Sequence, residues 1–300
     1  MRDLRCPICD EGRRTLVYRS TLPVEAETAH GRLVDPLSVH CQINRCAGCG
    51  LVYASPILDD ASVRALYAES PHTNVAAGEE ENVRRTFEGY YGLARRHLRR
   101  RERVLDIGCD VGLLLNTARK DGFRELHGVE PNPIAAARAR MVPGSVVSTE
   151  FYETIPYPAE QFDLVTLIHV VDHLVDVNRV LTKVFAELRP GGVVVSVVHN
   201  VGSLLARLLG ERFPPYNAYH HYFFTKRTLA ALFARAGFEP VESVSTRNVY
   251  SVGFLTQRAP LPSSVRHPLE VLVTSARLAG VAISLPLGNI GLVARKPAPA

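Results

Sequence analysis

The sequence predicts an α/β fold in which a doubly wound, mostly parallel sheet follows a small cysteine-rich module. Three observations predict it. From about residue 101, short apolar runs of strand length alternate with segments of helical periodicity. A glycine-containing turn follows the first of these runs, and two C-x2-C pairs lie near the start of the chain. We therefore expect residues 1–55 to form the cysteine module, 56–100 a helical linker and 101–300 the α/β domain.

The first strand, turn and helix of this domain indicate a ligand site. Val104 and Leu105 open an apolar run that leads into a turn containing Asp106, Ile107, Gly108, Cys109, Asp110 and Gly112. Glycine in such a turn lets a ligand approach the backbone closely. The next apolar run ends at Glu130, about 20 residues further on, where strand–helix–strand nucleotide sites place a ribose-binding carboxylate. We expect a nucleotide-like ligand at this turn.

The rest of the domain continues the alternation. Residues 162–168 are a mostly apolar run of strand length, as expected of a strand covered on both faces. A helix follows, with apolar residues at Val177, Leu181, Val184, Phe185 and Leu188. The sequence Pro190-Gly191-Gly192 ends it before a strand at 193–198. Thr225 can cap another helix, which Gly237 ends and whose apolar stripe is Leu229, Leu232, Phe233 and Ala236. Two last strands, at about 241–249 and 290–296, complete the sheet edge.

From about Arg101 onward the sequence resembles the class I S-adenosylmethionine-dependent methyltransferases. The resemblance rests on residues 106–112, on Glu130, and on the segments 162–163 (Phe-Asp), 171–174 (Val-Asp-His-Leu) and 188–192 (Leu-Arg-Pro-Gly-Gly). It implies a seven-stranded sheet and S-adenosylmethionine as the cofactor. The family usually has glycine where this chain has Asp110. A carboxylate there is electrostatically compatible with a sulfonium or ammonium group.

The same resemblance implies the cofactor-binding residues. Glu130 should hold the ribose, and Asp106 should order the turn that meets the methionine portion. The full set is Asp106, Gly108, Cys109, Asp110, Gly112, Leu113, Glu130, Pro131, Glu150, Phe151 and His169. We expect the Cys109 side chain to pack rather than to act as a nucleophile. An NAD-dependent dehydrogenase would also use a glycine turn and a ribose carboxylate, but this turn has one glycine fewer than the dinucleotide fingerprint.

The cysteine module predicts a structural zinc ion. Cys6 and Cys9 form one C-x2-C knuckle and Cys46 and Cys49 form another, so four thiolates can surround one Zn²⁺ and leave no open position for catalysis. The alternative interpretation of these four cysteines is that they form two disulfides or remain thiols that bind no metal. No signal peptide precedes Cys6, which favours a reducing, cytoplasmic location. Cys41, beside His40, is expected as a spare thiol on a strand, although it could replace a knuckle ligand.

A zinc ribbon before such a domain resembles a bacterial subgroup that includes deoxysugar and other natural-product methyltransferases. In that subgroup a histidine often precedes an aromatic pair and a Ser/Thr cap, as His220 precedes Phe223, Phe224 and Thr225 here. The resemblance therefore implies His220 as general base, supported by His221 or Tyr222, with His169 as the next candidate. His173 and His199 also lie where the transferred methyl is expected, beside the ends of the fourth and fifth strands.

Composition and three segments limit the other classes of function. The chain is 46% hydrophobic and 22% charged, which is typical of a packed globular enzyme. The arginines at 95, 96, 99, 100, 101 and 103 could bind RNA, but we interpret them as a solvated helix face. Residues 213–216 (Phe-Pro-Pro-Tyr) only imitate the tetrapeptide of amino-directed nucleic-acid methyltransferases. The stretch 269–287 is interrupted by charges, so it predicts an amphipathic helix over the substrate site or a homodimer partner rather than a membrane span.

The sequence thus predicts a zinc-ribbon-bearing methyltransferase that transfers the methyl group of S-adenosylmethionine to a small molecule of bacterial specialised or cell-envelope metabolism. An RNA base methyltransferase that grips RNA with the ribbon is the second hypothesis. A non-catalytic, cofactor-binding partner subunit is the third, and Asp110 is its motivation. A small-molecule acceptor is the expected partner, with no membrane and with nucleic acid disfavoured.

Overall fold

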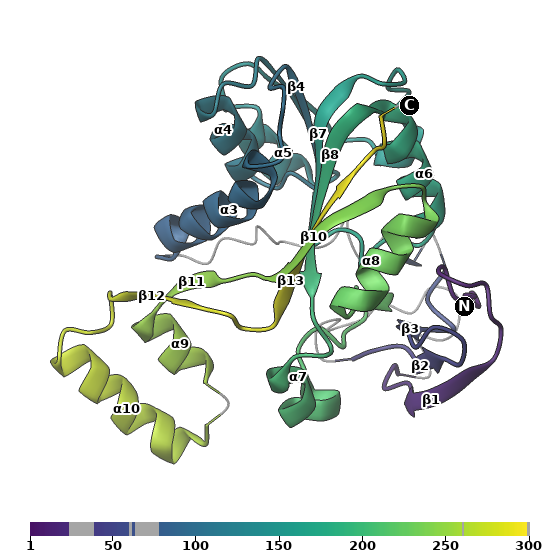
Figure 1. Cartoon of the computed structure of the whole chain (residues 1–300). Coiled ribbons are helices and arrows are strands. Elements are labelled where there is room, and N and C mark those ends of the chain that lie inside the picture. Colours follow the sequence, from purple (N-terminus) through teal and green to yellow (C-terminus); the bar gives the residue numbers. More distant parts are fainter. Residues whose placement is uncertain (24–38, 60–61, 64–77, 260, 299–300) are drawn as a thin grey trace.

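The computed structural model describes residues 1–23, 39–59, 62–63, 78–259 and 261–298. Its centre is a seven-stranded sheet of order β10-β13-β8-β7-β4-β5-β6 (Figure 1). β13 is antiparallel to β8 and β10, and the other paired strands are parallel, so the predicted doubly wound, mostly parallel sheet is confirmed. The strands are β4 (Arg103–Ile107), β5 (Glu125–Val129), β6 (Ser145–Ser148), β7 (Phe162–Ile168), β8 (Leu188–His199), β10 (Glu239–Ser245) and β13 (Asn289–Arg295).

Helices cover both faces of this sheet. In Figure 1, α3 (Glu80–Arg95), α4 (Leu113–Lys120) and α5 (Pro133–Ala139) lie on one side, and α6 (Val177–Glu187) and α8 (Lys226–Arg235) on the other. Successive residues of β7 face opposite sides: Leu164 packs into the core under α3, α4 and α5, while Val165 packs into the core under α6 and α8. α3 lies within the segment expected as a linker, yet it buries Tyr90 and Tyr91 in the first of these cores.

The helix signals of the sequence act as predicted at α8. The Thr225 hydroxyl accepts a hydrogen bond from the Thr228 backbone N–H, and the two residues form a reciprocal capping box. Gly237, with φ of 94°, follows the last turn. β8 begins earlier than expected. Leu188, predicted in the preceding helix, is the first strand residue, because Pro190 disfavours the helical conformation of Arg189 and the helix ends before that residue.

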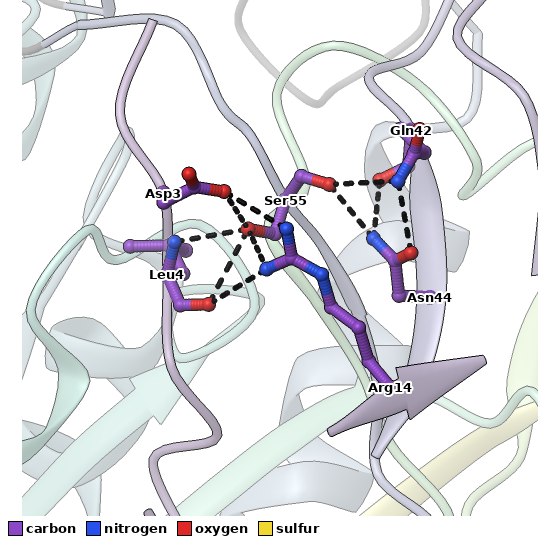
Figure 2. A network of polar contacts seen from close by, with 6 residues as sticks. All are labelled: Asp3, Leu4, Arg14, Gln42, Asn44 and Ser55. Atoms are coloured by element: carbon purple, nitrogen blue, oxygen red, sulfur yellow. Dashed lines mark hydrogen bonds and ion pairs between the residues drawn. The ribbon is translucent and has the colours of Figure 1, made fainter. Parts of the chain in front are cut away.

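A second sheet carries the cysteine knuckles. β1 (Arg14–Tyr18), β2 (Ile43–Cys46) and β3 (Val52–Ala54) pair antiparallel, and β9 (Tyr222–Phe223) from the α/β part adds the fourth strand. Figure 2 shows the polar network that ties the first residues to this sheet: the Ser55 hydroxyl accepts from the Leu4 N–H and the Arg14 guanidinium. The Ser55 carbonyl accepts from the Asn44 amide. Because β9 completes the sheet, this module and the α/β domain share one hydrophobic core.

The C-terminal third departs from the predicted elements. β10 ends at Ser245, and β11 (Asn248–Ser251) instead pairs with β12 (Ala282–Leu285) in a separate sheet, so the expected continuous strand 241–249 is wrong. α9 (Val252–Arg258) and α10 (Ser263–Ser275) lie between them and extend away from the main sheet (Figure 1). Short helical turns complete the chain: η1 (Tyr152–Thr154), α7 (Leu204–Leu209) and η2 (Gly210–Arg212).

The predicted amphipathic helix at 269–287 is also wrong in its bounds. α10 ends at Ser275, and Arg277 adopts φ of 57°, the left-handed conformation that stops a helix. The N–H groups of Arg277 and Leu278 donate to the carbonyls of Thr274 and Val273, which is a Schellman motif. Within the described residues, no helix has both the length and the apolar character needed to cross a membrane.

Candidate functional site

The glycine turn between β4 and α4 is closely packed on its inner side. Gly108 has φ of 71°, and a Cβ at this position would lie 2.6 Å from Val170 Cγ2. Gly112 has φ of 82°, and its Cβ would lie 3.0 Å from Ala139 Cα. Both positions therefore require glycine for conformation and for space. The turn is fixed to β5 by the Gly108 N–H, which donates to the Val129 carbonyl at 2.8 Å.

Glu130 is held directly beside this turn. Its Oε2 accepts a hydrogen bond from the Asp110 N–H at 2.9 Å, and its Oε1 accepts from the Asn132 N–H at 2.9 Å. Each carboxylate oxygen retains a further lone pair, so both can still accept from ribose hydroxyls. Asp110 has φ of 45°, the left-handed conformation that glycine usually supplies and that aspartate tolerates better than most residues.

Three carboxylates give the turn a negative potential. Asp106 is 2% exposed and accepts a hydrogen bond from the Thr166 hydroxyl at 2.6 Å. Burial, with a smaller contribution from the charges of Glu130 and Asp110, raises the pKa of Asp106 to about 7 against the opposing effect of the Thr166 hydrogen bond. Burial likewise raises the pKa of Glu130. A ligand with a sulfonium and an ammonium group would relieve this repulsion, so the residues present fit S-adenosylmethionine.

The other predicted cofactor residues surround the same end of the sheet. Leu113 is the first residue of α4, and Pro131 follows Glu130. Glu150 and Phe151 follow β6, the strand beside β5, and Glu150 is exposed. Cys109 points away from the ligand side: a Cβ on Gly128 would lie 2.8 Å from its Sγ, and burial raises the pKa of its thiol. These features agree with a packing role for Cys109.

A cluster of histidines lies where β7 and β8 end. His169 follows β7, with φ of 55°, and donates its backbone N–H to the Val197 carbonyl; His199 is the last residue of β8. Their rings lie 4.8 Å apart between centroids. His220 lies 5.4 Å from His199 and 4.2 Å from His173 by the same measure. Val170, which touches the Gly108 position, is the neighbour of His169, so this histidine cluster adjoins the cofactor turn.

Asp172 lies within the histidine cluster. It is 2% exposed, and its Oδ2 is 3.6 Å from His220 Nε2. Burial raises the pKa of Asp172 to about 7, although the backbone N–H groups of Asp172 and His199 oppose the rise. Burial lowers the pKa of His199 to about 4 and that of His220 well below its usual range. The imidazoles are therefore neutral near pH 7.

Two asparagines fix the proton positions of the cluster. The Asn217 side-chain oxygen accepts from the Tyr219 backbone N–H, so the Nδ1 of His220, 3.0 Å from the same oxygen, must carry its proton. The Nε2 of His220 then presents a lone pair. His199 Nδ1 lies 2.9 Å from Asn289 Oδ1, while the Asn289 amide nitrogen donates to the Tyr90 hydroxyl. His199 Nε2 presents a lone pair in the same way.

His221 and Tyr222 make structural contacts instead of joining His220. The His221 backbone N–H donates to the Asp172 carbonyl, and its Nδ1 lies 3.2 Å from the Leu174 carbonyl. The Tyr222 hydroxyl donates to the Val175 carbonyl, and its backbone pairs with Tyr53 of β3. Both residues fix the segment that carries His220.

The four knuckle cysteines come together at the edge of the second sheet. Cys6 Sγ and Cys49 Sγ are 3.4 Å apart, Cys9 Sγ and Cys46 Sγ are 3.5 Å apart, and all four sulfurs lie within 4.8 Å of one another. Tetrahedral zinc with bonds of about 2.3 Å needs sulfurs about 3.8 Å apart, so the arrangement fits one ion. No pair forms a disulfide among the described cysteines. Cys41 precedes β2 rather than lying on a strand, and neither it nor His40 joins the four sulfurs.

A family model described as a methyltransferase domain matches residues 80–243, which is more than half of the chain. The chain belongs to this methyltransferase family. Membership of this family supports S-adenosylmethionine as the cofactor of the matched domain.

Curated relatives and a solved structure agree with this assignment. Ubiquinone biosynthesis O-methyltransferase of Bradyrhizobium sp. (strain ORS 278) is 38% identical over 97 residues, which are 31% of this chain and 38% of that protein. The protein of the same name from Bordetella avium (strain 197N) is 29% identical over 159 residues, 46% of this chain and 62% of that protein. The match thus spans less than two thirds of each relative. A chain from the complex of the Haloferax volcanii Trm112 methyltransferase activator with a methyltransferase shares the fold, with a TM-score of 0.54, 17% identity and coverage of 73% of this chain and 92% of that chain.

The arginine run of the methyltransferase is paired with carboxylates. Arg100 lies 3.8 Å from Asp163, and Arg103 donates to Glu125 at 2.7 Å. Three further arginines of the run pair in the same way: Arg95 and Arg101 with Asp121, and Arg96 with Glu242. These ion pairs neutralise most of the charge that would attract phosphates, which agrees with a solvated face.

Several residues that shape the site carry no sequence signal of their own. Asn289 and Tyr90 act through partners that are distant in sequence, as in the 199-residue separation between them, whereas the Asn217 side chain contacts its neighbours Pro214, Tyr219 and His220. Asp172 stands in the quoted Val-Asp-His-Leu segment, but its position among four histidines depends on the strand order. Only the rule that parallel strands bring their carboxyl ends together could have suggested it.

Proposed function

We propose that this methyltransferase acts on a small molecule of bacterial specialised or cell-envelope metabolism. The observation that carries the proposal is the histidine cluster with Asp172, which adjoins the cofactor turn and lies largely out of solvent. Buried polar groups of this kind suit a compact acceptor with a few hydrogen-bonding atoms. The names of the relatives, O-methyltransferases of ubiquinone biosynthesis, also favour a small molecule.

The chain's residues would divide the work of an in-line methyl displacement. S-adenosylmethionine supplies the electrophilic methyl group when bound. Glu130 would accept from the ribose hydroxyls, and the carboxylates of Asp106 and Asp110 would face the cationic groups. His220 would take the proton of the acceptor at Nε2, because its Nδ1 already donates to Asn217. Asp172, 3.6 Å from that nitrogen, would stabilise the imidazolium that forms.

We further propose that residues 1–55 bind one structural Zn²⁺ through Cys6, Cys9, Cys46 and Cys49. Two arginines of α8 reach the knuckles: Arg227 donates to the Cys49 carbonyl and Arg235 to the Ile8 carbonyl. The metal would therefore support α8 and the preceding β9 as well as the knuckles. Unbridged thiols also favour the cytoplasm as the location. The homodimer suggested by the sequence stays a prediction, with Val265, Val271 and Leu272 of α10 exposed.

The test follows labelled methyl groups from S-adenosylmethionine into a bacterial small-molecule extract and, separately, into total RNA. We expect label in a small-molecule fraction and none in RNA. Label in RNA alone would overturn the proposal in favour of the RNA base methyltransferase. Cofactor binding without transfer to either pool would overturn it in favour of the partner subunit.

A further inference from the structure

The histidine cluster contains an unusual set of unpaired ligand atoms. The Oδ1 and Oδ2 atoms of Asp172 and the Nδ1 of His169 are buried and accept no hydrogen bond of normal geometry from any described residue. Leaving a buried carboxylate in this state is costly unless a proton or a cation lies beside it. One ligand atom from each of His169, Asp172 and His199 lies within 4.8 Å of the other two.

The surroundings prepare these atoms for a cation. The His199 ring donates Nδ1–H to Asn289, whose amide in turn reaches the Tyr90 hydroxyl, and this second layer directs the Nε2 lone pair into the cluster. A hydrogen bond on the far ring nitrogen is the usual support of a metal-ligating histidine. The backbone at His169 is in the left-handed region, a strained conformation that persists only where the surroundings enforce it.

We propose that His169, Asp172 and His199 bind a divalent first-row transition-metal ion, which takes an oxygen of the methyl acceptor as a further ligand. Two imidazoles and one carboxylate suit such ions and leave coordination positions open. This site is separate from the four thiolates, because its ligands are nitrogen and oxygen. The acceptor part of the proposal rests on the proposed function, whereas metal binding does not.

A metal ion at this position would favour a methyl acceptor that carries a hydroxyl group. Coordination lowers the pKa of a bound hydroxyl group, as it does for water. The acceptor oxygen would release its proton to His220 Nε2 and form the new O–CH3 bond. The C–S bond of the sulfonium would break with its electron pair staying on sulfur, so charge and atoms balance. A phenol or alcohol whose oxygen can reach the metal is therefore the expected substrate class.

Co²⁺ titration of the full-length protein with its thiolate site loaded with Zn²⁺ tests the metal. We expect one Co²⁺ per chain, with a d–d spectrum that lacks sulfur-to-cobalt charge transfer. The His199→Ala variant should bind Co²⁺ at least about 100-fold more weakly, and Asn289→Ala about 10- to 100-fold more weakly, because it removes only the second layer. His267→Ala, whose side chain is 84% exposed, is the matched control and should bind normally.

If no Co²⁺ binds outside the thiolate site, the proposal is overturned. The buried Asp172 carboxylate would then be explained by a proton shared with His220. Equal Co²⁺ affinity in wild type and His199→Ala would overturn the ligand assignment. If His199→Ala fails to fold, His199→Gln keeps most of the volume and is read in the same way. Calorimetry with S-adenosylmethionine on the same samples separates the two claims, because loss of cofactor binding would concern the proposed function and not the metal.

Discussion

At the scale of single residues, the cofactor turn depends on backbone conformations that only a few side chains permit. Gly108 and Gly112 have no room for a Cβ, whereas Asp110 occupies a left-handed position at a cost of about 1–2 kcal/mol relative to glycine. Its carboxylate adds to those of Asp106 and Glu130. Asp110 therefore makes the backbone of the turn less stable than glycine would. In exchange, we infer, it strengthens the negative potential that faces a cationic cofactor.

Glu130 should contribute to cofactor affinity through the ribose. Glu130→Ala removes both acceptor oxygens and should weaken S-adenosylmethionine binding by about 1–3 kcal/mol, the cost of leaving polar partners unpaired. Isothermal calorimetry measures the change. Glu239→Ala, on the exposed edge strand β10, is the control. Equal affinity in the Glu130 variant and wild type would show that the ribose lies elsewhere.

Asp106 should make the stability of the cofactor-free protein depend on pH. Its pKa is 3.8 when unfolded and about 7 when folded, so between these values the folded state holds a proton that the unfolded state has lost. The contribution of Asp106 to the free energy of unfolding should therefore fall as pH rises from about 4 to about 7. Chemical denaturation of wild type and Asp106→Asn across this range measures it. Parallel pH profiles for the two proteins would contradict the assignment.

His220 should affect turnover more than cofactor binding. Without the base, His220→Ala should lower kcat by about 100-fold or more, while the affinity for S-adenosylmethionine stays nearly unchanged because the ribose and methionine contacts lie at the turn. Steady-state kinetics and calorimetry on the same variant provide the comparison. Normal turnover would mean that alignment alone suffices, and His169 would be tested next.

At the scale of elements, the bounds of strands buried on both faces could be predicted closely from the sequence. The bounds of elements that end at an unusual backbone conformation could not. β7 has the predicted bounds because residues 162–168 are apolar apart from Asp163 and Thr166. The end of α10 depends on the left-handed Arg277, a residue type that gives no such signal. β9 has only two residues and pairs with β3, about 170 positions earlier in the chain, so no local pattern could reveal it.

Because β9 and α8 connect the cysteine knuckles to the segment that carries His220, we expect loss of the zinc ion to disturb the position of His220. Cys6→Ser should remove bound zinc and disorder the knuckles, which release Arg227 and Arg235. Turnover should therefore fall at least about 10-fold through His220, while cofactor affinity at the distant turn changes little. Metal analysis, kinetics and calorimetry check the three parts. Cys41→Ala is the control and should keep its zinc, and a Cys6→Ser protein with full metal content would refute the four-thiolate site.

At the scale of the whole molecule, the cysteine module and the α/β domain form one unit with two hydrophobic cores. The sequence predicted the four-cysteine cluster, the mostly parallel sheet and the glycine turn, because each leaves a local motif, and cofactor binding by the named residues stays a prediction. The histidines could be expected beside the transferred methyl, but the position of Asp172 among them could not be predicted, since it requires the order β8-β7-β4 and the return of the chain along β9. The site is therefore assembled from segments that only the complete fold brings together.

A crystal structure with S-adenosylhomocysteine would show whether the cofactor turn and the histidine cluster form one active site. We expect the ribose hydroxyls on Glu130, the amino acid portion against the turn at residues 108–112, and the sulfur directed toward His169 and His199. A ribose bound away from Glu130, or a sulfur directed away from the histidine cluster, would contradict it.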